Sequence, residues 1–139
     1  MPGTRGGQVN MIVLDASVGV KWFRSEPGSE DARELLRRHG SGEVVITVPS
    51  LFVYEFAGVA TRLLDRGERD GLWRRFLSWR IVVREVGDGL MRDSMRIADR
   101  LGCSLYDAVA PALAESLDAP LVSADRRAHA LWPGVTLLG

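Results

Sequence analysis

Four acidic residues lie inside or directly beside apolar segments, where a soluble chain seldom places charge. They are Asp15 after MIVL, Glu55 within SLFVYEFAGVA, Asp107 within SLYDAVAPALA and Asp125 after APLVSAD. An ionised carboxylate among apolar neighbours is costly unless a positive group compensates it. No lysine or arginine within those segments neutralises all four, so a divalent metal ion is the economical hypothesis if folding brings the carboxylates together.

Three of these residues also have an ordinary structural explanation at the start of a helix. Asp15 is placed to cap a helix beginning near Val18, and Asp125 to cap a short helix after it. Asp107 follows Ser104 by three residues, a spacing that resembles a capping box with Asp in place of Glu. Capping explains each residue singly and leaves their joint pattern unexplained.

Glu55 is the hardest of the four to explain as a structural residue. It stands three residues after Phe52 and four before Val59, and therefore close to the buried face of its helix. A lone glutamate is costly there. A shared pocket accounts for Glu55 and for the three aspartates together.

The elements that must position these residues follow from apolar runs bounded by Gly, Pro or Asp. Because longer segments with helical periodicity separate the runs, we expect an α/β fold, a central parallel sheet of about five strands flanked by helices. The length of 139 residues with 46% hydrophobic residues fits one domain, expected over 11–139 after a flexible extension at 1–10. The expected strands are residues 11–14, 44–48, 81–86, 120–123 and 135–138.

Helices are expected between the strands. Ser29 is placed to cap the first long helix, which Gly40 ends, and Ser50 opens the second. Further helices are expected over 70–79, 89–101 and 104–117. In the helix over 89–101, spacing suggests that the inward-facing residues are Met91, Met95, Ala98 and Leu101.

In a parallel sheet the carboxyl ends of all strands meet at one edge, and ligands bind where the strand order reverses. Asp15 and Asp125 each follow an expected strand. Glu55 lies in the first turns of the helix after the second strand, and Asp107 in the first turn of the helix before the fourth. All four carboxylates are therefore able to converge on one pocket.

Composition argues against several other functions. The net charge of zero argues against a strongly basic nucleic-acid binder, and the single cysteine, Cys103, excludes an intrachain disulfide and a thiolate metal cluster. His39 and His129 are the only histidines, and we expect both at the surface, which disfavours a histidine base or a zinc site. No segment reads as a secretion signal or a membrane span, so a cytoplasmic protein is expected.

Four blocks in order, VLDASVGVKWF, VYEFAGV, LYDAVAPALAE and LVSADRR, resemble a PIN-domain protein of the VapC-like toxin group, from Met11 to about Leu138. The resemblance implies a metal-dependent ribonuclease that uses Mg²⁺, or Mn²⁺ in its place. The acidic quartet of such proteins matches Asp15, Glu55, Asp107 and Asp125. Ser17 and Ser123 match small hydroxylated residues at strand ends, as supporting ligands or substrate contacts.

Within that interpretation, Asp15 and Asp107 form the main metal site, and Asp125 and Glu55 complete it or orient the attacking water. Arg126 is one of two candidates for binding RNA phosphates; the other is Arg127. The resemblance also implies a cognate antitoxin, received in a groove between early helices, and a homodimer. It implies no membrane.

Two alternatives stay open on the sequence. The acidic quartet alone is equally compatible with a nuclease acting on DNA ends or structured DNA. A catalytically weak binding module that represses its operon with an antitoxin is kept open by Pro111. This proline lies four residues after Asp107 and removes the amide that would bond the Asp107 carbonyl, so we expect the helix to kink there or to begin late.

Overall fold

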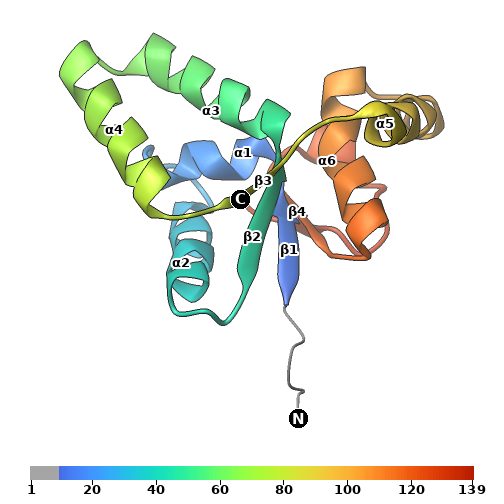
Figure 1. The fold of residues 1–139 in the computed structure, drawn as a ribbon, viewed down its shortest axis with the longest axis horizontal. Coiled ribbons are helices and arrows are strands. Elements are labelled where there is room, and N and C mark those ends of the chain that lie inside the picture. Colours follow the sequence, from blue (N-terminus) through green and yellow to red (C-terminus); the bar gives the residue numbers. More distant parts are fainter. Residues whose placement is uncertain (1–9) are drawn as a thin grey trace.

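The computed structural model of the protein describes residues 10–139 and contains one parallel sheet (Figure 1). The strand order is β3-β2-β1-β4-β5, and every neighbouring pair is parallel. The expected α/β class is confirmed. Of the extension expected at residues 1–10, all but Asn10 lies outside the described residues. The strands are β1 (Met11–Leu14), β2 (Val45–Pro49), β3 (Val82–Arg84), β4 (Leu121–Ser123) and β5 (Thr136–Leu137).

Helices cover both faces of the sheet. The first four α-helices and the 3-10 turn lie on one side, whereas α5 and α6 pack together on the other (Figure 1). None of the helices in residues 10–139 is long and apolar enough to cross a membrane. The helices are α1 (Ala16–Gly19), η1 (Val20–Trp22), α2 (Ser29–Gly40), α3 (Ser50–Leu63), α4 (Arg66–Ser78), α5 (Asp88–Leu101), α6 (Leu105–Leu117) and α7 (Arg126–His129).

The core is divided by the sheet into two apolar clusters. Successive side chains of β1 point to opposite faces, so Ile12 and Leu14 join one cluster and Val13 the other. The first cluster is rich in aromatic rings, with Phe56 at its centre and the rings of Phe52 and Phe76 around it. The second cluster is mainly aliphatic and joins α5 and α6 to the sheet.

Two helix starts differ from those expected. The helix α4 begins at Arg66 rather than at residue 70, because Asp65 and Glu68 form a complete capping box there. Gly28, with φ of 88°, precedes α2, and no side chain caps this helix. The Ser29 hydroxyl instead binds the loop before it, donating to the Arg24 carbonyl and accepting from the Glu26 amide.

The inward face of α5 was predicted correctly for Ala98 and Leu101, which pack against the second cluster, and wrongly for Met91 and Met95. Met91 and Met95 are 37% and 51% exposed, whereas Ser94 and Ile97 are fully buried. Ser94 donates its hydroxyl to the carbonyl of Leu90, 2.8 Å away, so its polar group has a local partner. The buried face of α5 therefore contains a serine, which the spacing of apolar residues alone does not predict.

Candidate functional site

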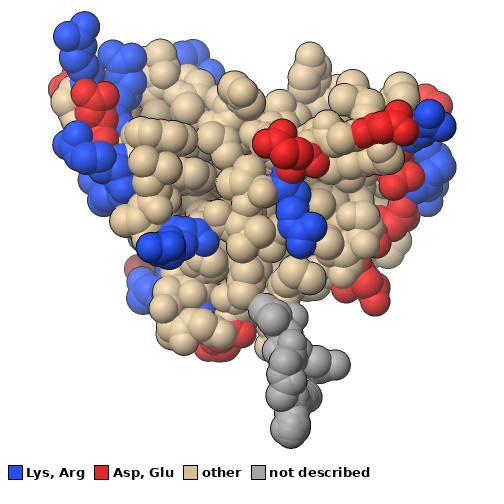
Figure 2. All heavy atoms as spheres, in the orientation of Figure 1, with Lys and Arg blue, Asp and Glu red and all other residues tan. Residues whose placement is uncertain are grey.

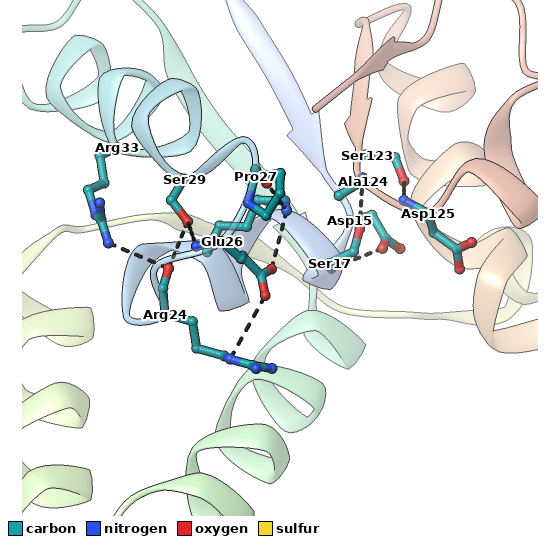
Figure 3. Close-up of polar contacts among 11 residues, drawn as sticks. Asp15, Ser17, Arg24, Glu26, Pro27, Ser29, Arg33, Ser123, Ala124 and Asp125 are labelled. Atoms are coloured by element: carbon teal, nitrogen blue, oxygen red, sulfur yellow. Dashed lines mark hydrogen bonds and ion pairs between the residues drawn. The ribbon is translucent and has the colours of Figure 1, made fainter. Parts of the chain in front are cut away.

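The strand order reverses between β1 and β4, and two aspartates follow the carboxyl ends of these strands (Figure 3). Asp15 comes directly after β1 and caps α1, its Oδ2 accepting from the Ser17 amide at 3.0 Å. The Ser17 hydroxyl accepts from the Ala124 amide at 2.9 Å and so joins the two loops. Asp125 follows two residues after β4. This is the place in a parallel α/β sheet where ligands bind.

The loop that carries Asp125 is held by local hydrogen bonds. Asp125 Oδ1 accepts from the Ala128 amide at 3.1 Å and caps α7, and the Asp125 amide donates to Ser123 Oγ at 3.0 Å. Ser123 has no exposed surface. In this structure Ser17 and Ser123 therefore support the site by fixing its loops.

The other two acidic residues come from helix starts at the same edge. Asp107 lies in the first turn of α6, and Glu55 lies in the second turn of α3. The pKa of Glu55 is raised to about 7, first by burial and then by the negative charges of Asp15 and Asp107. Three of the four carboxylates therefore act on one another, although the Glu55 side chain stays open to solvent.

The fourth carboxylate, Asp125, shares one neighbour with Asp107, the thiol of Cys103. Burial raises the pKa of the Cys103 thiol, and the charges of Asp107 and Asp125 raise it further. Asp107 is therefore close enough to Glu55 to raise its pKa. Asp107 and Asp125 are both close enough to Cys103 to raise the pKa of its thiol. None of the four acids forms an ion pair with a lysine or arginine in residues 10–139.

The donor set suits a hard divalent cation, and its spacing limits how such an ion would bind. Among residues 10–139, no three His, Cys, Asp or Glu side chains stand close enough together to hold a metal ion directly. Mg²⁺ commonly uses one or two carboxylates and keeps several waters, and it prefers oxygen donors. Carboxylates without a compensating cation, two of which raise the pKa of a third, fit that mode of binding. Asp15 and Glu55 also line one shallow hollow with Tyr106.

Capping and site formation prove to be compatible. Ser104 Oγ accepts from the Asp107 amide at 3.0 Å, so Ser104 caps α6 as its spacing predicted. Asp15 and Asp125 cap their helices as well. Each cap fixes the backbone of an aspartate at the same edge of the sheet, and each aspartate is only partly buried.

The helix α6 begins at Leu105 and continues through Pro111, so the late start considered from the sequence does not occur. Pro111 has no amide to offer the carbonyl of Asp107. His129 Nε2 lies 2.6 Å from that carbonyl oxygen and takes the place of the missing donor. The backbone of Asp107 is therefore held in spite of the proline.

The expectation that both histidines lie at the surface is wrong. His129 is completely buried, and His39 is half-buried between α2 and β2. His39 Nε2 lies 2.8 Å from the Trp79 carbonyl, and its Nδ1 accepts from the Ile46 amide at 3.0 Å. The signal that could have led to His129 is the orphaned carbonyl of Asp107, which requires a donor from elsewhere in the chain.

Two arginines complete the edge. Arg126 and Arg127 open α7 directly after Asp125, and both are exposed. Neither forms an ion pair within residues 10–139. They are therefore free to meet a charged ligand next to the acidic residues.

Comparisons with known proteins agree with this fold. The PIN-domain family profile matches residues 12–131. A search of curated protein sequences found no match. A toxin–antitoxin complex from Klebsiella pneumoniae superposes with a TM-score of 0.71 at 16% identity, over 90% of this chain and 95% of that one. DNA-bound VapBC from Salmonella typhimurium gives 0.70 at 18% identity, over 94% and 97%. The sarcin-ricin-loop-cleaving toxin VapC20 from Mycobacterium tuberculosis gives 0.71 at 16%, over 92% and 99%.

Proposed function

The chain belongs to the PIN-domain family, whose profile covers residues 12–131, and from this premise we propose that it is a Mg²⁺-dependent endoribonuclease, the toxin of a toxin–antitoxin pair. The observation that carries the proposal is the position of Asp15, Glu55 and Asp107 at one edge of the sheet, with no ion pair to a cation in the described part of the chain. The raised pKa of Glu55 is consistent with this arrangement. Mg²⁺ is the expected cation, and Mn²⁺ is its closest substitute.

In the proposed mechanism, a divalent cation held at this edge supplies charge neutralisation and a more acidic water for attack on a phosphodiester. Asp15 and Asp107 provide the main carboxylate ligands, with Asp125 beside Asp107. The Glu55 carboxylate lies beside Asp15 and Asp107 and would complete the site or orient the attacking water. Arg126 and Arg127 would bind RNA phosphates outside the cation site.

We propose that the antitoxin occupies a groove of about 440 Å³ between α3 and α4. Its lining combines apolar side chains, among them Phe56 and Trp73, with two arginines and one aspartate, Arg66, Arg69 and Asp70. Arg69 Nε is buried and has no hydrogen-bond partner among the described residues. Basic side chains gather around the α3–α4 turn and along α4 (Figure 2). These features favour an antitoxin segment that carries apolar and acidic residues.

A second copy of the chain is proposed beside the acidic edge, because the hollow described next shares Tyr106 with the one that Asp15 and Glu55 line. Tyr54 and Tyr106 are 77% and 65% exposed and line a mainly apolar hollow of about 210 Å³ together with Met91. Large exposed apolar side chains around a hollow suit a protein interface. Light scattering of the purified protein tests the homodimer, and a monomer at all concentrations would refute it.

The nuclease proposal is tested with matched RNA and DNA oligonucleotides that have the same sequence and hairpin. We expect cleavage of the RNA with Mg²⁺ and none with EDTA. Asp15→Asn and Asp107→Asn should each abolish cleavage, whereas Asp99→Asn, an exposed aspartate on α5, should not change it.

The same assay separates the alternatives. Cleavage of the DNA alone would make the protein a DNA nuclease. If neither the RNA nor the DNA oligonucleotide is cleaved at any Mg²⁺ concentration, a binding module that acts with an antitoxin would be favoured. Unchanged cleavage by Asp15→Asn would contradict the assigned site.

A further inference from the structure

A proline in α6 leaves one backbone carbonyl of the candidate site without its helical partner. The carbonyl of Asp107 would ordinarily accept from the amide of residue 111, which is a proline. An unpaired carbonyl in a buried setting is costly, and almost every such group in a folded protein has a partner. The partner in this structure comes from α7, twenty-two residues along the chain.

The partner is the ring of His129, which has no exposed surface. Its Nε2 lies 2.6 Å from the Asp107 carbonyl oxygen, and its Nδ1 lies 2.6 Å from Ser123 Oγ. A carbonyl oxygen only accepts, so Nε2 carries the proton. In the neutral ring Nδ1 is then an acceptor, and the Ser123 hydroxyl donates to it.

The hydrogen bonds continue from the ring to a second acidic residue. Ser123 Oγ donates to His129. The same oxygen accepts from the Asp125 amide at 3.0 Å (Figure 3). One unbroken chain of hydrogen bonds therefore joins the backbone of Asp107 on α6 to the backbone of Asp125 after β4. Because both ends are fixed through one rigid ring, the separation of the two aspartates depends on that ring.

We propose that His129 is a positioning residue that sets Asp107 and Asp125 relative to each other for cation binding. The inference rests on the proposed function only where it concerns the cation. Hydrogen-bonded residues behind metal ligands commonly change metal affinity by 10- to 100-fold when they are replaced. Pro111 makes this chain dependent on His129, because the helix itself no longer supplies the donor.

His39 provides a matched control. It is also a histidine that bridges two backbone groups, donating from Nε2 to the Trp79 carbonyl and accepting at Nδ1 from the Ile46 amide. These two partners belong to β2 and to the segment directly after α4, and neither is one of the four acidic residues. Replacing His39 tests the general effect of losing such a bridge.

The first experiment needs no cation. In ¹⁵N NMR spectra of the metal-free protein, His129 should show a protonated Nε2 and an unprotonated Nδ1. His129→Asn should change the carbonyl ¹³C shift of Asp107 and speed hydrogen exchange of the Asp125 amide, and His39→Asn should change neither. If Asp107 and Asp125 are unaffected by His129→Asn, the proposal is overturned whatever the protein binds.

The second experiment measures Mn²⁺ affinity by electron paramagnetic resonance. His129→Asn should weaken binding about tenfold. His129→Gln, whose amide can reach the position of Nε2, should stay within about threefold of the parent, as should His39→Asn. Equal Mn²⁺ affinity of folded His129→Asn and the parent would overturn the proposal. If the parent binds no Mn²⁺ while the NMR changes occur, the proposed function fails and the positioning role stands.

A double variant tests the link to Pro111 directly. Pro111→Ala returns an amide to the helix, so Asp107 no longer requires His129. We expect Pro111→Ala/His129→Asn to bind Mn²⁺ more tightly than His129→Asn alone but less tightly than the parent, because the ring that joins Asp107 to Ser123 is still absent. If His129→Asn alone does not fold, the double variant should still fold and bind Mn²⁺. A double variant that recovers neither folding nor affinity would overturn the assigned contact.

Discussion

Neutralising Glu55 should stabilise the metal-free protein at alkaline pH and have little effect in acid. The pKa of Glu55 is raised from 4.5 to about 7 by burial, Asp15 and Asp107. Below the lower value the carboxyl group is protonated in the folded and unfolded chain alike, so it adds no cost. Between 4.5 and about 7 the unfolded chain has released this proton while the folded chain still holds it, so stability falls as the pH rises across this range and levels off above it. Glu55→Gln removes that loss.

The magnitude follows from the same pKa values. A pKa difference of about 2.5 corresponds to about 3.4 kcal/mol at most, at 1.36 kcal/mol for each pKa unit. The Glu55 side chain is exposed, so solvent screening reduces this limit. We therefore expect a gain of about 1 kcal/mol for Glu55→Gln above neutral pH.

Urea unfolding in EDTA at about pH 5 and about pH 8.5 measures the effect. The stability difference between Glu55→Gln and the parent should grow by about 1 kcal/mol between the two conditions. Glu30→Gln replaces an exposed glutamate in the first turn of α2, and its difference should be the same at both pH values. A Glu55→Gln difference that does not grow with pH would refute the reasoning about the shared negative field.

Three further changes have expected outcomes. Phe56→Ala removes a ring that is 1% exposed from the centre of the aromatic cluster, and should lower the free energy of unfolding by about 3–5 kcal/mol in urea. Asp65→Ala breaks the capping box of α4 and should cost about 1 kcal/mol in the same assay. Replacing Arg126 and Arg127 together with alanine should weaken RNA binding and reduce its dependence on salt; binding that is unchanged at every salt concentration would remove both arginines from the interface.

The strands and the edge that carries the acidic residues were predictable from the sequence. Short apolar runs such as MIVL and PLVS are bounded by Asp or Pro, and this local pattern alone marks where each strand ends. The parallel arrangement then places the residues after β1 and β4 at one edge, so the positions of Asp15 and Asp125 follow from general rules of topology. The spacing of Ser104 and Asp107 likewise predicted the start of α6.

The role of His129 was not predictable by those rules, because it depends on a contact between residues far apart in the chain. A histidine near the C-terminus carries no local sign of burial, since its ring has both a polar and an apolar character. The ring can be buried because both of its nitrogens form hydrogen bonds in the folded chain, one with the Asp107 carbonyl and one with the Ser123 hydroxyl. The sequence shows that Pro111 leaves the Asp107 carbonyl without a helical donor. It does not show that His129 supplies the replacement.

The buried face of α5 shows a different limit. Two helical stripes compete in this segment, one through Met91 and Met95 and one through Ser94 and Ile97. Counting apolar residues favours the first stripe. The structure uses the second, because Ser94 returns its hydroxyl to the helix backbone and can then be buried against α6 at little cost.

The central claim is that the carboxylates at the β1–β4 edge hold a divalent cation. Crystals grown without metal and soaked in Mn²⁺ allow the ion to be located by its anomalous scattering. We expect a peak beside the carboxylates of Asp15 and Asp107, and its loss in Asp15→Asn crystals. Fully soaked parent crystals with no peak at this edge would contradict it.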